Sequence, residues 1–281
     1  MLLKRGKPEA VEIAGQLAPW LTASGHEAWV VEGGETGAID GARVTSEREL
    51  AARIDLLLVL GGDGTLLHGA SLVAEREIPI LGVNLGHLGF LASCAPADAR
   101  AALERALKGA LPVEQRMRLH CLLRRGSGEE VVKVACNDAV VSQGALARLI
   151  ELEAFLDGNL VTRYRADGLI VASPTGSTAY NLAAGGPIVT PEVRAVVVTP
   201  ICPHTLTNRP LVAPASSRLT VRLAAPAEHV LFTVDGQWAT QLGFKDTLEI
   251  SEASPPLHLY RTWESYFDLL RTKLSWGERE G

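Results

Sequence analysis

The sequence has few of the features that mark membrane, secreted or nucleic-acid-binding proteins. No apolar stretch approaches the roughly 20 residues that a membrane-spanning helix needs, and the N-terminal residues lack the apolar segment of a signal peptide. Lys and Arg number 27 against 32 Asp and Glu, so the formal net charge is −5, and the basic residues form no block. Binding to a nucleic-acid backbone is therefore not expected, although backbone N–H groups can still hold a small anionic ligand.

Cysteine and aromatic residues are also scarce. Cys94, Cys121, Cys136 and Cys202 form no C-x-x-C pair, so neither a disulfide framework nor a cysteine-type zinc site is expected, and the thiols should be reduced and partly buried. Aromatic residues make up 5% of the chain, so the core must consist mainly of Ala, Val and Leu. Together these absences favour a soluble cytoplasmic protein.

What is present is a globular composition with a regular pattern. The 281 residues, 47% hydrophobic and 21% charged, suffice for one large domain or two modest ones. Over the first 110 residues helical and strand patterns alternate, which predicts helices packed on a mostly parallel sheet. The expected helices cover residues 9–21, a short segment from Ser46, 65–75 and 97–108, and the expected strands cover 28–31, 54–60 and 79–83.

After Pro112 the pattern changes to short strands separated by turn residues. Such a series is typical of an all-β, sandwich-like domain, and an amphipathic segment at 263–274 predicts a final helix. We therefore expect an α/β domain at 1–112, a β-rich domain at 113–260, and a C-terminal helix at 261–281 that returns to the first domain. The expected strands cover 119–123, 131–134, 149–156, 160–164, 169–172, 195–199, 219–223, 230–234 and 247–250.

The first candidate site is the glycine-rich turn Gly61-Gly62-Asp63-Gly64-Thr65, between an expected buried strand and a helix. Glycines there allow a sharp turn and bring backbone N–H groups close to a phosphate, and the helix start favours an anion. Asp63 would repel a phosphate, so its presence suggests a role in accepting a proton or holding a metal. The alternative is an ordinary turn in which Asp63 or Thr65 caps the helix.

The second candidate site is the run from Arg165 to Pro187, in which a strand leads into a loop dense in hydroxyl groups and glycine. Such a loop before a short helix suits an anionic or hydroxyl-rich ligand. Read singly, its Ser and Thr residues can be simple helix caps or turn residues.

Several shorter motifs are less specific than these two candidate sites. Asn137-Asp138 could hydrogen-bond a base or sugar, or form a simple turn, and Asp235-Gly236 on its own indicates a hairpin turn. His87 and His204 lack metal-type spacing. The sequence contains neither G-x-S-x-G nor H-E-x-x-H, which argues against two common hydrolase types.

Taken together, these segments resemble the NAD kinase family. The resemblance spans about residues 54–237, and its most specific parts are the NLGxLGF run at Asn84–Phe90 and the DG…SPTGSTAYN…GGP segment. The GGDG element is also found in diacylglycerol-kinase-like and phosphofructokinase-like enzymes. The other matching elements are Asn137-Asp138, Asn208-Arg209-Pro210-Leu211 and Asp235-Gly236-Gln237.

This resemblance implies a nucleotide cleft between the two domains and transfer of a phosphoryl group to the 2′-hydroxyl of the adenosine ribose of NAD, which gives NADP. It implies ATP or inorganic polyphosphate as donor, a divalent metal such as Mg²⁺, and a homodimer or homotetramer. Asp63 corresponds to the proton acceptor, and Asp138 stands where the family has Glu, one methylene longer. The implied ligand-binding positions are Gly62, Gly64, Thr65, His68, Phe90, Asn137, Asp138, Arg148, Arg165, Asp167, Thr175, Thr178, Ala179, Tyr180, Asn181, Leu182, Ala183, Asp235 and Gln237.

Two other functions are compatible with parts of the pattern. One is a kinase of the broader GGDG group that phosphorylates a lipid or a sugar, and a comparison of acceptors with ATP would distinguish it. The other is a dinucleotide sensor without catalytic activity, which predicts binding of NAD or NADP with no product. The intact Asp63 argues against the sensor.

Overall fold

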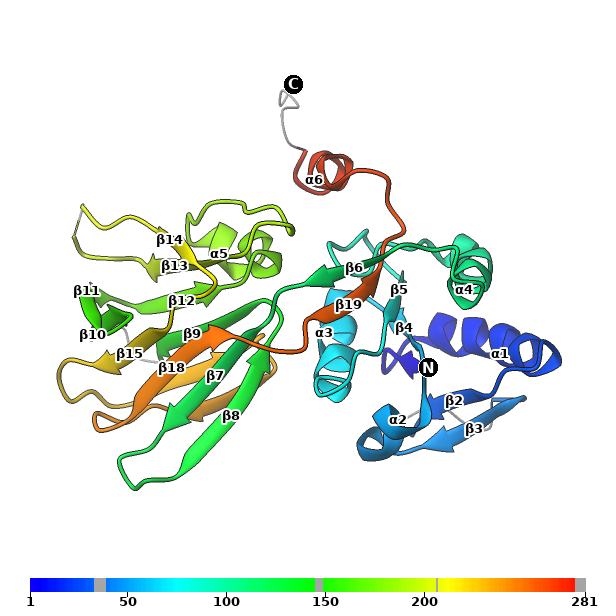
Figure 1. Ribbon diagram of the computed structural model, residues 1–281, viewed down its shortest axis with the longest axis horizontal. Coiled ribbons are helices and arrows are strands. Elements are labelled where there is room, and N and C mark those ends of the chain that lie inside the picture. Colours follow the sequence, from blue (N-terminus) through cyan, green and yellow to red (C-terminus); the bar gives the residue numbers. More distant parts are fainter. Residues whose placement is uncertain (33–38, 145–148, 206, 276–281) are drawn as a thin grey trace. The chain divides into compact units, whose positions relative to one another are not determined.

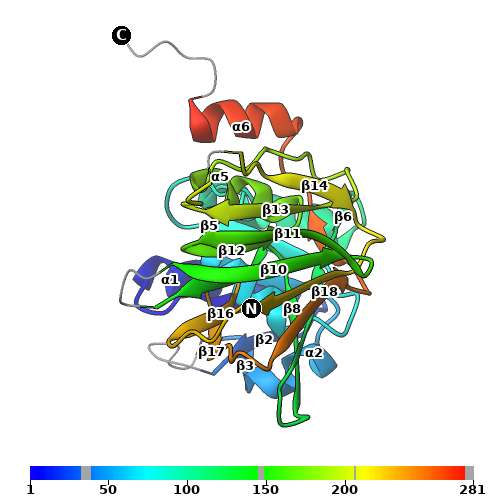
Figure 2. The same cartoon turned by 90° about the vertical axis from the view of Figure 1, so that its left-hand side faces the viewer.

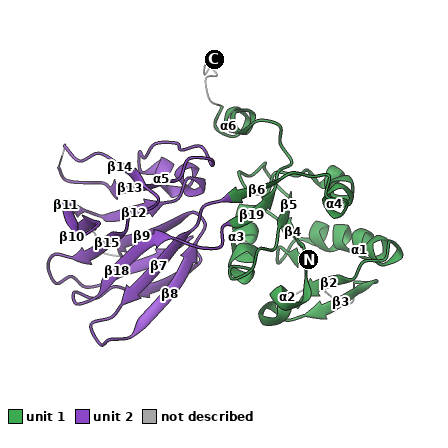
Figure 3. Ribbon diagram, in the orientation of Figure 1, with its two compact units in different colours: residues 1–115, 257–281 green, residues 116–256 purple. Residues whose placement is uncertain are grey.

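The computed structural model describes residues 1–32, 39–144, 149–205 and 207–275. The chain forms two compact units, shown in different colours in Figure 3. Unit 1 comprises Met1–Gln115 and Leu257–Gly281, and unit 2 comprises Arg116–Pro256.

Unit 1 is built on a five-stranded sheet with the order β1-β4-β5-β19-β6 (Figure 1). The pairs β1–β4, β4–β5 and β5–β19 are parallel, and every residue of β4 and β5 is buried. A parallel strand covered on both faces needs a continuous apolar run, which residues 57–60 supply. The strands are β1 (Leu2–Leu3), β4 (Leu57–Gly61), β5 (Ile80–Asn84), β6 (Val113–Arg116) and β19 (Leu257–Tyr260), and β2 (Ala28–Val31) pairs separately with β3 (Ala42–Thr45).

The helices of unit 1 contribute narrow apolar faces to this core. Helix α1 buries Ala10, Ala14, Leu17, Ala18 and Leu21, a spacing of three and four residues that lies along one side of a helix. These residues belong to the same hydrophobic cluster as residues of β4 and β5. The helices are α1 (Pro8–Ala23), α2 (Glu47–Arg53), α3 (Asp63–Leu72), α4 (Ala99–Leu107), which follows the 3₁₀ turn η1 (Pro96–Asp98), and α6 (Tyr266–Leu274).

Unit 2 consists of two six-stranded antiparallel sheets, which can be followed in Figure 1 and Figure 2. One sheet has the order β11-β10-β15-β18-β7-β8, and the other has the order β14-β13-β12-β9-β16-β17. The strands are β7 (Leu119–Arg124), β8 (Glu130–Ala135), β9 (Asp138–Gln143), β10 (Ile150–Leu156), β11 (Asn159–Ala166), β12 (Gly168–Ala172), β13 (Ala195–Ile201), β14 (Leu211–Pro214), β15 (Leu219–Leu223), β16 (Val230–Val234), β17 (Trp238–Gln241) and β18 (Thr247–Glu252).

A single hydrophobic cluster joins these two sheets. It contains alternate residues of β7 and β15 from the first sheet, such as Leu119, Leu123 and Val221, and residues of the second, such as Val171 and Phe232. Alternation is the pattern of strands with one buried face. The expected fold, an α/β part with a mostly parallel sheet followed by a sandwich-like β part and a final helix, is confirmed.

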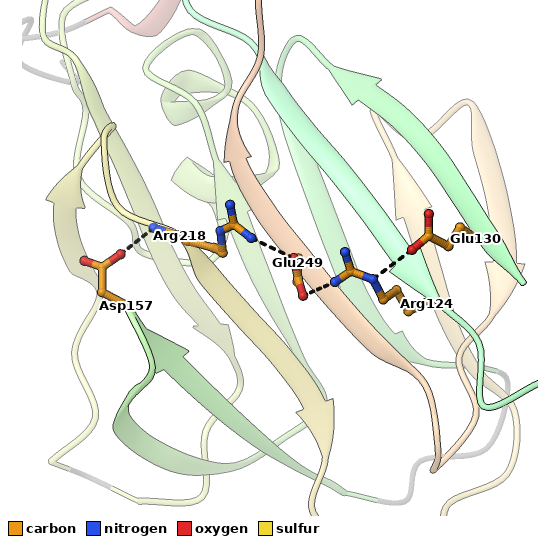
Figure 4. Close-up of polar contacts among 5 residues, drawn as sticks. All are labelled: Arg124, Glu130, Asp157, Arg218 and Glu249. Atoms are coloured by element: carbon orange, nitrogen blue, oxygen red, sulfur yellow. Dashed lines mark hydrogen bonds and ion pairs between the residues drawn. The ribbon is translucent and has the colours of Figure 1, made fainter. Parts of the chain in front are cut away.

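The outer face of the first sheet of unit 2 carries a row of alternating charges (Figure 4). Arg124 on β7 donates to Glu130 on β8 at 2.9 Å and also pairs with Glu249 on β18. Arg218 reaches Glu249 at 3.2 Å, and its backbone N–H donates to Asp157 at 2.8 Å. Exposed ion pairs each contribute about 0–1 kcal/mol, so this row mainly identifies the face that is turned to solvent.

Two local expectations differ from the structure. Ser46 precedes α2 as expected, and with Glu49 three residues later the sequence predicts a capping box, but the Ser46 side chain makes no capping hydrogen bond. Residues 257–260, which the sequence groups with the β-rich part, form β19 and pair with β5 of unit 1 through Leu259 and Ile80. Ser254-Pro255-Pro256 mark a break before this strand, but four residues carry no sign of the sheet that they join.

In the part of the chain that the structure describes, no helix is both long enough and apolar enough to cross a membrane. All four cysteines are free, and three of them are buried, as the sequence led us to expect.

Substitution by alanine should change the free energy of unfolding in opposite directions at two glycines of unit 1. A Cβ at Gly82 would lie 2.6 Å from Leu66 Cδ1 and 2.9 Å from the Cα of Ala92, whereas one at Gly15 would meet nothing within 4 Å. Gly82→Ala should lower the free energy of unfolding by about 1–3 kcal/mol through overpacking. Gly15→Ala should raise it by up to about 1 kcal/mol, because alanine is the better helix former. Urea unfolding of both variants tests this, and equal stabilities would contradict the packing described for β5.

Candidate active site

The glycine-rich turn joins β4 directly to α3. Gly61 ends the strand, Gly62 is the N-cap, and the helix begins at Asp63 without a side-chain cap. A Cβ on Gly61 would lie 2.5 Å from Thr65 Oγ1, so a side chain there would push the first helical turn away from the strand. Asp63 is therefore not the cap of this helix, and the capping alternative does not account for it.

The Asp63 carboxylate instead binds a turn that lies far away in the sequence. The backbone N–H of Phe90 donates to Oδ2 at 2.8 Å, and those of Leu91 and Ala92 donate to Oδ1 at 3.1 and 2.8 Å. A Cβ on Gly89 would lie 2.0 Å from Asp63 Oδ1, so only glycine allows the turn to come this close. An ionised carboxylate has about four acceptor positions, and these three bonds leave room for about one more.

Asn84 holds the same turn from the other side. Its side-chain Nδ2 donates to the carbonyl oxygens of His87 at 2.6 Å and Ala92 at 3.0 Å, and its Oδ1 accepts from the Gly86 N–H at 2.8 Å. The NLGxLGF run is thus a loop folded around one buried amide at the end of β5. Its last residue, Phe90, and the next two residues present their N–H groups to Asp63.

His68 lies in the second turn of α3, beside a cavity of about 430 Å³. Its Nε2 is 2.9 Å from Glu47 Oε1. Gly64 and Thr65 also line this cavity, together with residues at the ends of β1 and β2. Of the residues implied by the resemblance, the structure therefore brings Gly62, Asp63, Gly64, Thr65, His68 and Phe90 together within unit 1.

Unit 2 repeats the carboxylate arrangement. Asp235 Oδ2 accepts from the Cys136 N–H at 2.8 Å, and Oδ1 accepts from those of Asn137 and Asp138 at 2.7 and 3.1 Å. Asp235 and Gly236 both have positive φ, as a tight hairpin between β16 and β17 requires. Asp235 is thus both the turn residue that the dipeptide indicated and the acceptor that orders Asn137-Asp138.

Burial changes the acidity of this pair of carboxyls. Burial, with a smaller effect from the Asp235 carboxylate, raises the pKa of Asp138 from 3.8 to about 7. Burial also raises the pKa of Asp235, although the three N–H bonds oppose that rise. Asp138 is 6% exposed, and a shorter side chain than the family's Glu keeps its carboxyl closer to the backbone.

The loop at Ser173–Asn181 is held mostly by its own hydroxyl and amide groups. Ser173 Oγ donates to the Cys136 carbonyl at 2.5 Å, and Ser177 Oγ accepts from the Val189 N–H at 3.0 Å. Asn181 is fully buried and its amide donates to the Ser177 carbonyl at 3.0 Å. The resemblance implies Asn181 as a ligand contact, but in this structure its side chain holds the loop together. The loop contains the 3₁₀ turn η2 (Thr175–Thr178) and leads into helix α5 (Tyr180–Ala183).

Two polar atoms in this region are buried without a partner among the described residues. They are Asn137 Oδ1 and Thr175 Oγ1, and both belong to the implied ligand-binding set. Gly176 brings the two segments together, because a Cβ there would lie 2.1 Å from the Asn137 carbonyl oxygen. Buried polar atoms normally have partners, so these two indicate a ligand or water that bonds to them.

The remaining implied positions lie nearer the surface. Thr178, Ala179 and Leu182 are half-buried, whereas Tyr180, Ala183, Arg165, Asp167 and Gln237 are exposed. Arg148 lies outside the described residues. The sequence reasoning missed Asn84 and Gly89 as supports of Asp63, and it missed Lys4, Arg5, Glu32 and Glu47 around the cavity. The pair Lys4-Arg5, which directly follows a short apolar segment, is the sequence feature that could have indicated this cavity.

Comparisons with known proteins agree along nearly the whole chain. Residues 1–111 match the ATP-NAD kinase N-terminal domain, and residues 136–262 match the ATP-NAD kinase C-terminal domain. The NAD kinase of Geotalea daltonii is 44% identical over 273 residues, covering 97% of this chain and 96% of that protein. The NAD kinase of Geobacter sp. strain M21 is 46% identical over 277 residues, covering 97% and 96%.

Solved structures show the same relationship. Yeast NADH kinase complexed with NADH superposes with a TM-score of 0.88 at 29% identity, covering 99% of this chain and 88% of that one. An NAD kinase from Archaeoglobus fulgidus in complex with ATP gives a TM-score of 0.76 at 26% identity, covering 98% of both chains. The turn that fixes Asp63, the two-unit fold and these relatives lead to one conclusion: the chain belongs to the ATP-NAD kinase family.

Proposed function

We propose that this protein transfers the terminal phosphoryl group of ATP to the 2′-hydroxyl of the adenosine ribose of NAD, with Asp63 as the proton acceptor. The observation that carries the assignment of Asp63 is its carboxylate, held by three backbone N–H groups at the end of a buried strand. Relatives named NAD kinase, and solved relatives with NADH and with ATP, support the two substrates.

In this reaction a bond forms between the ribose oxygen and the γ-phosphorus while the bond to the β–γ bridging oxygen breaks. Phosphoryl transfer depends mainly on positioning and on stabilising charge. A carboxylate whose direction is fixed can orient the hydroxyl and take its proton as the new bond forms. The three N–H bonds limit the rotation of the Asp63 side chain, so this orientation exists before the substrate arrives.

Within unit 2 we propose that the unpartnered Asn137 Oδ1 and Thr175 Oγ1 bond to NAD. Asp138 lies beside them and is the carboxyl that would meet a ribose hydroxyl. Thr178, Ala179 and Tyr180 follow on the same loop, and Asp235 acts by ordering Asn137-Asp138. The proposed contacts of Arg148, Arg165, Asp167 and Gln237 depend on the resemblance alone.

A divalent cation such as Mg²⁺ would accompany the donor. In the described part of the chain no three His, Cys, Asp or Glu side chains converge on one point. This fits a cation carried chiefly by the donor phosphates, since Mg²⁺ usually keeps several waters and takes only one or two protein carboxylates. It would supply neutralisation of the phosphate charge, while the chain orients the hydroxyl.

We also propose a cytoplasmic homo-oligomer. The four free cysteines suit a reducing compartment, and the edge strand β11 exposes Leu160 and Val161, as a surface that another chain covers would. Light scattering after gel filtration should give the mass of two or four 29.9-kDa chains. A mass of one chain at micromolar concentration would contradict the assembly.

Asp63→Asn tests the proton acceptor. General-base assistance is typically worth 10²–10⁴-fold, so turnover should fall at least a hundredfold while NADP still binds by calorimetry. The amide replaces one carboxylate oxygen by an NH₂ group, which then faces at least one of the three N–H donors, so the thermal stability of the variant must be measured in parallel. Turnover within tenfold of the wild type in a folded variant would overturn the assignment.

The raised pKa of Asp138 predicts that the free energy of unfolding depends on pH. Its pKa of about 7 in the folded protein, against 3.8 when unperturbed, means that the folded state holds a proton there between about pH 4 and 7 and the unfolded state does not. The contribution of Asp138 to the free energy of unfolding therefore falls as pH rises through this interval. Asp138→Asn removes the titration, so the stability of the wild type relative to this variant should decline from pH 5 to pH 8.

Urea unfolding at four pH values measures this difference. Glu12→Gln, on the exposed side of α1, controls for the change in net charge. A difference between wild type and Asp138→Asn that stays constant across the range would show that the carboxyl is not desolvated in the folded protein.

A further inference from the structure

A buried threonine on β13 is bonded to the loop that carries several of the proposed NAD contacts. Thr199 lies opposite Ile170 of β12 in the second sheet of unit 2, outside every motif that the sequence singled out. Its Oγ1 donates to Asn181 Oδ1 at 2.6 Å. Thr199 and Asn181 are both fully buried, so neither side chain touches a ligand in this structure. The bond between them serves the fold of the loop.

The amide of Asn181 joins two segments of this loop. Its Nδ2 donates to the Ser177 carbonyl at 3.0 Å and to the Pro187 carbonyl at 3.1 Å. Both amide hydrogens are therefore used, and Oδ1 is the acceptor that Thr199 satisfies. A Cβ on Gly186 would lie 2.1 Å from this same Oδ1, so glycine is required there for the amide to keep its place.

The loop is attached to the second sheet at both ends. At its beginning, Ser173 Oγ donates to the carbonyl of Cys136, which lies just before β9. At its end, Asn181 is bonded to Thr199 on β13. The proposed contacts from Thr175 to Tyr180 lie between these two attachments, so the position of this segment depends on both of them.

The same sheet carries the other proposed NAD contacts of unit 2. Strand β12 lies between β9 and β13, and Ala172 of β12 pairs with Asp138 at the start of β9. An attachment to β13 therefore sets where the loop lies relative to Asn137-Asp138. Two sets of contacts that must meet one dinucleotide are thereby held in one frame.

We propose that Thr199 is a positioning residue for NAD, which acts through Asn181 to keep the loop from Thr175 to Ala183 in its binding conformation. The inference rests on the proposed function and adds to it a residue that does not touch the substrate. Without the Thr199 hydroxyl, Asn181 Oδ1 would be buried without a donor, and conformations in which the loop is displaced become more populated. The apparent dissociation constant rises as the binding-competent fraction falls, whereas turnover at saturating NAD changes little because bound NAD restores the loop.

A graded series at this position separates the hydroxyl from the packing around it. Thr199→Ser keeps the hydroxyl, Thr199→Cys offers the weaker S–H donor, and Thr199→Val keeps the shape without a donor. Thr220→Val, the same change on β15 of the other sheet, is the matched control. The measurements are kcat, the KM for NAD, the KM for ATP, the Kd of NADP by calorimetry and the thermal stability, with all binding and kinetics at a temperature where every variant is folded.

Thr199→Val should raise the KM for NAD and the Kd of NADP about tenfold. Thr199→Cys should give intermediate values and Thr199→Ser values close to those of the wild type, with kcat and the KM for ATP within about threefold throughout. Thr220→Val should change none of these constants. In an Asn181→Ala background, Thr199→Val should add less than twofold, because residues that act through one bond are not additive.

NAD and NADP binding within twofold of the wild type in folded Thr199→Val would overturn the proposal, and a lowered thermal stability alone would then assign Thr199 a purely structural role. Equal losses in Thr199→Ser and Thr199→Val would also overturn it, since packing and not the hydroxyl would be responsible. If Thr199→Val does not fold, equal constants for the Ser and Cys variants overturn it. A wild type that binds NADP but forms none from NAD would instead refute the proposed function, and calorimetry of the same series would still test Thr199.

Discussion

The structure depends on one interaction used twice, a carboxylate that accepts three consecutive backbone N–H groups. Asp63 orders residues 90–92 in unit 1, and Asp235 orders residues 136–138 in unit 2. Loop N–H groups have no strand or helix partner, and leaving them buried without one costs about 1–3 kcal/mol each. One ionised side chain satisfies three of them, and bonds to a charged acceptor are the stronger kind. A loop can therefore fold tightly without regular secondary structure.

Close approach of backbones is the second requirement of this arrangement, and glycine meets it. A side chain at Gly89 would occupy the place of the Asp63 carboxylate, and one at Gly176 would overlap the Asn137 carbonyl. Neither glycine needs positive φ, so neither marks a turn that only glycine can adopt. They are glycines because another chain segment lies where a Cβ would be. This explains why the motifs of the two units contain glycine at positions that do not bend the chain.

The sequence alone predicts what depends on local periodicity and misses what depends on distant partners. The apolar run before Gly61 predicted a strand buried on both faces, and turn residues between short apolar runs predicted the β-rich unit 2. Whether Asp63 is a cap or a functional group was open, because its partners lie 27–29 residues further on. Asn84 and Gly89 were parts of a recognised motif, but their role as supports of Asp63 appears only when the loop is folded. Strand β19 was missed for the same reason, since nothing near Leu259 indicates β5.

The folded loops also change the expectation of how an acidic chain holds an anionic donor. Loop N–H groups were expected to lie close to a phosphate, yet those at 90–92 and 136–138 are bonded to aspartates. These N–H groups position carboxylates, and carboxylates suit the hydroxyl side of a phosphoryl transfer. In the proposed reaction the phosphate side is left to the turn Gly61–Thr65 and the start of α3, because a helix N-terminus favours an anion. A net charge of −5 is compatible with this division, since a helix start at the end of a strand needs no basic surface to attract a phosphate.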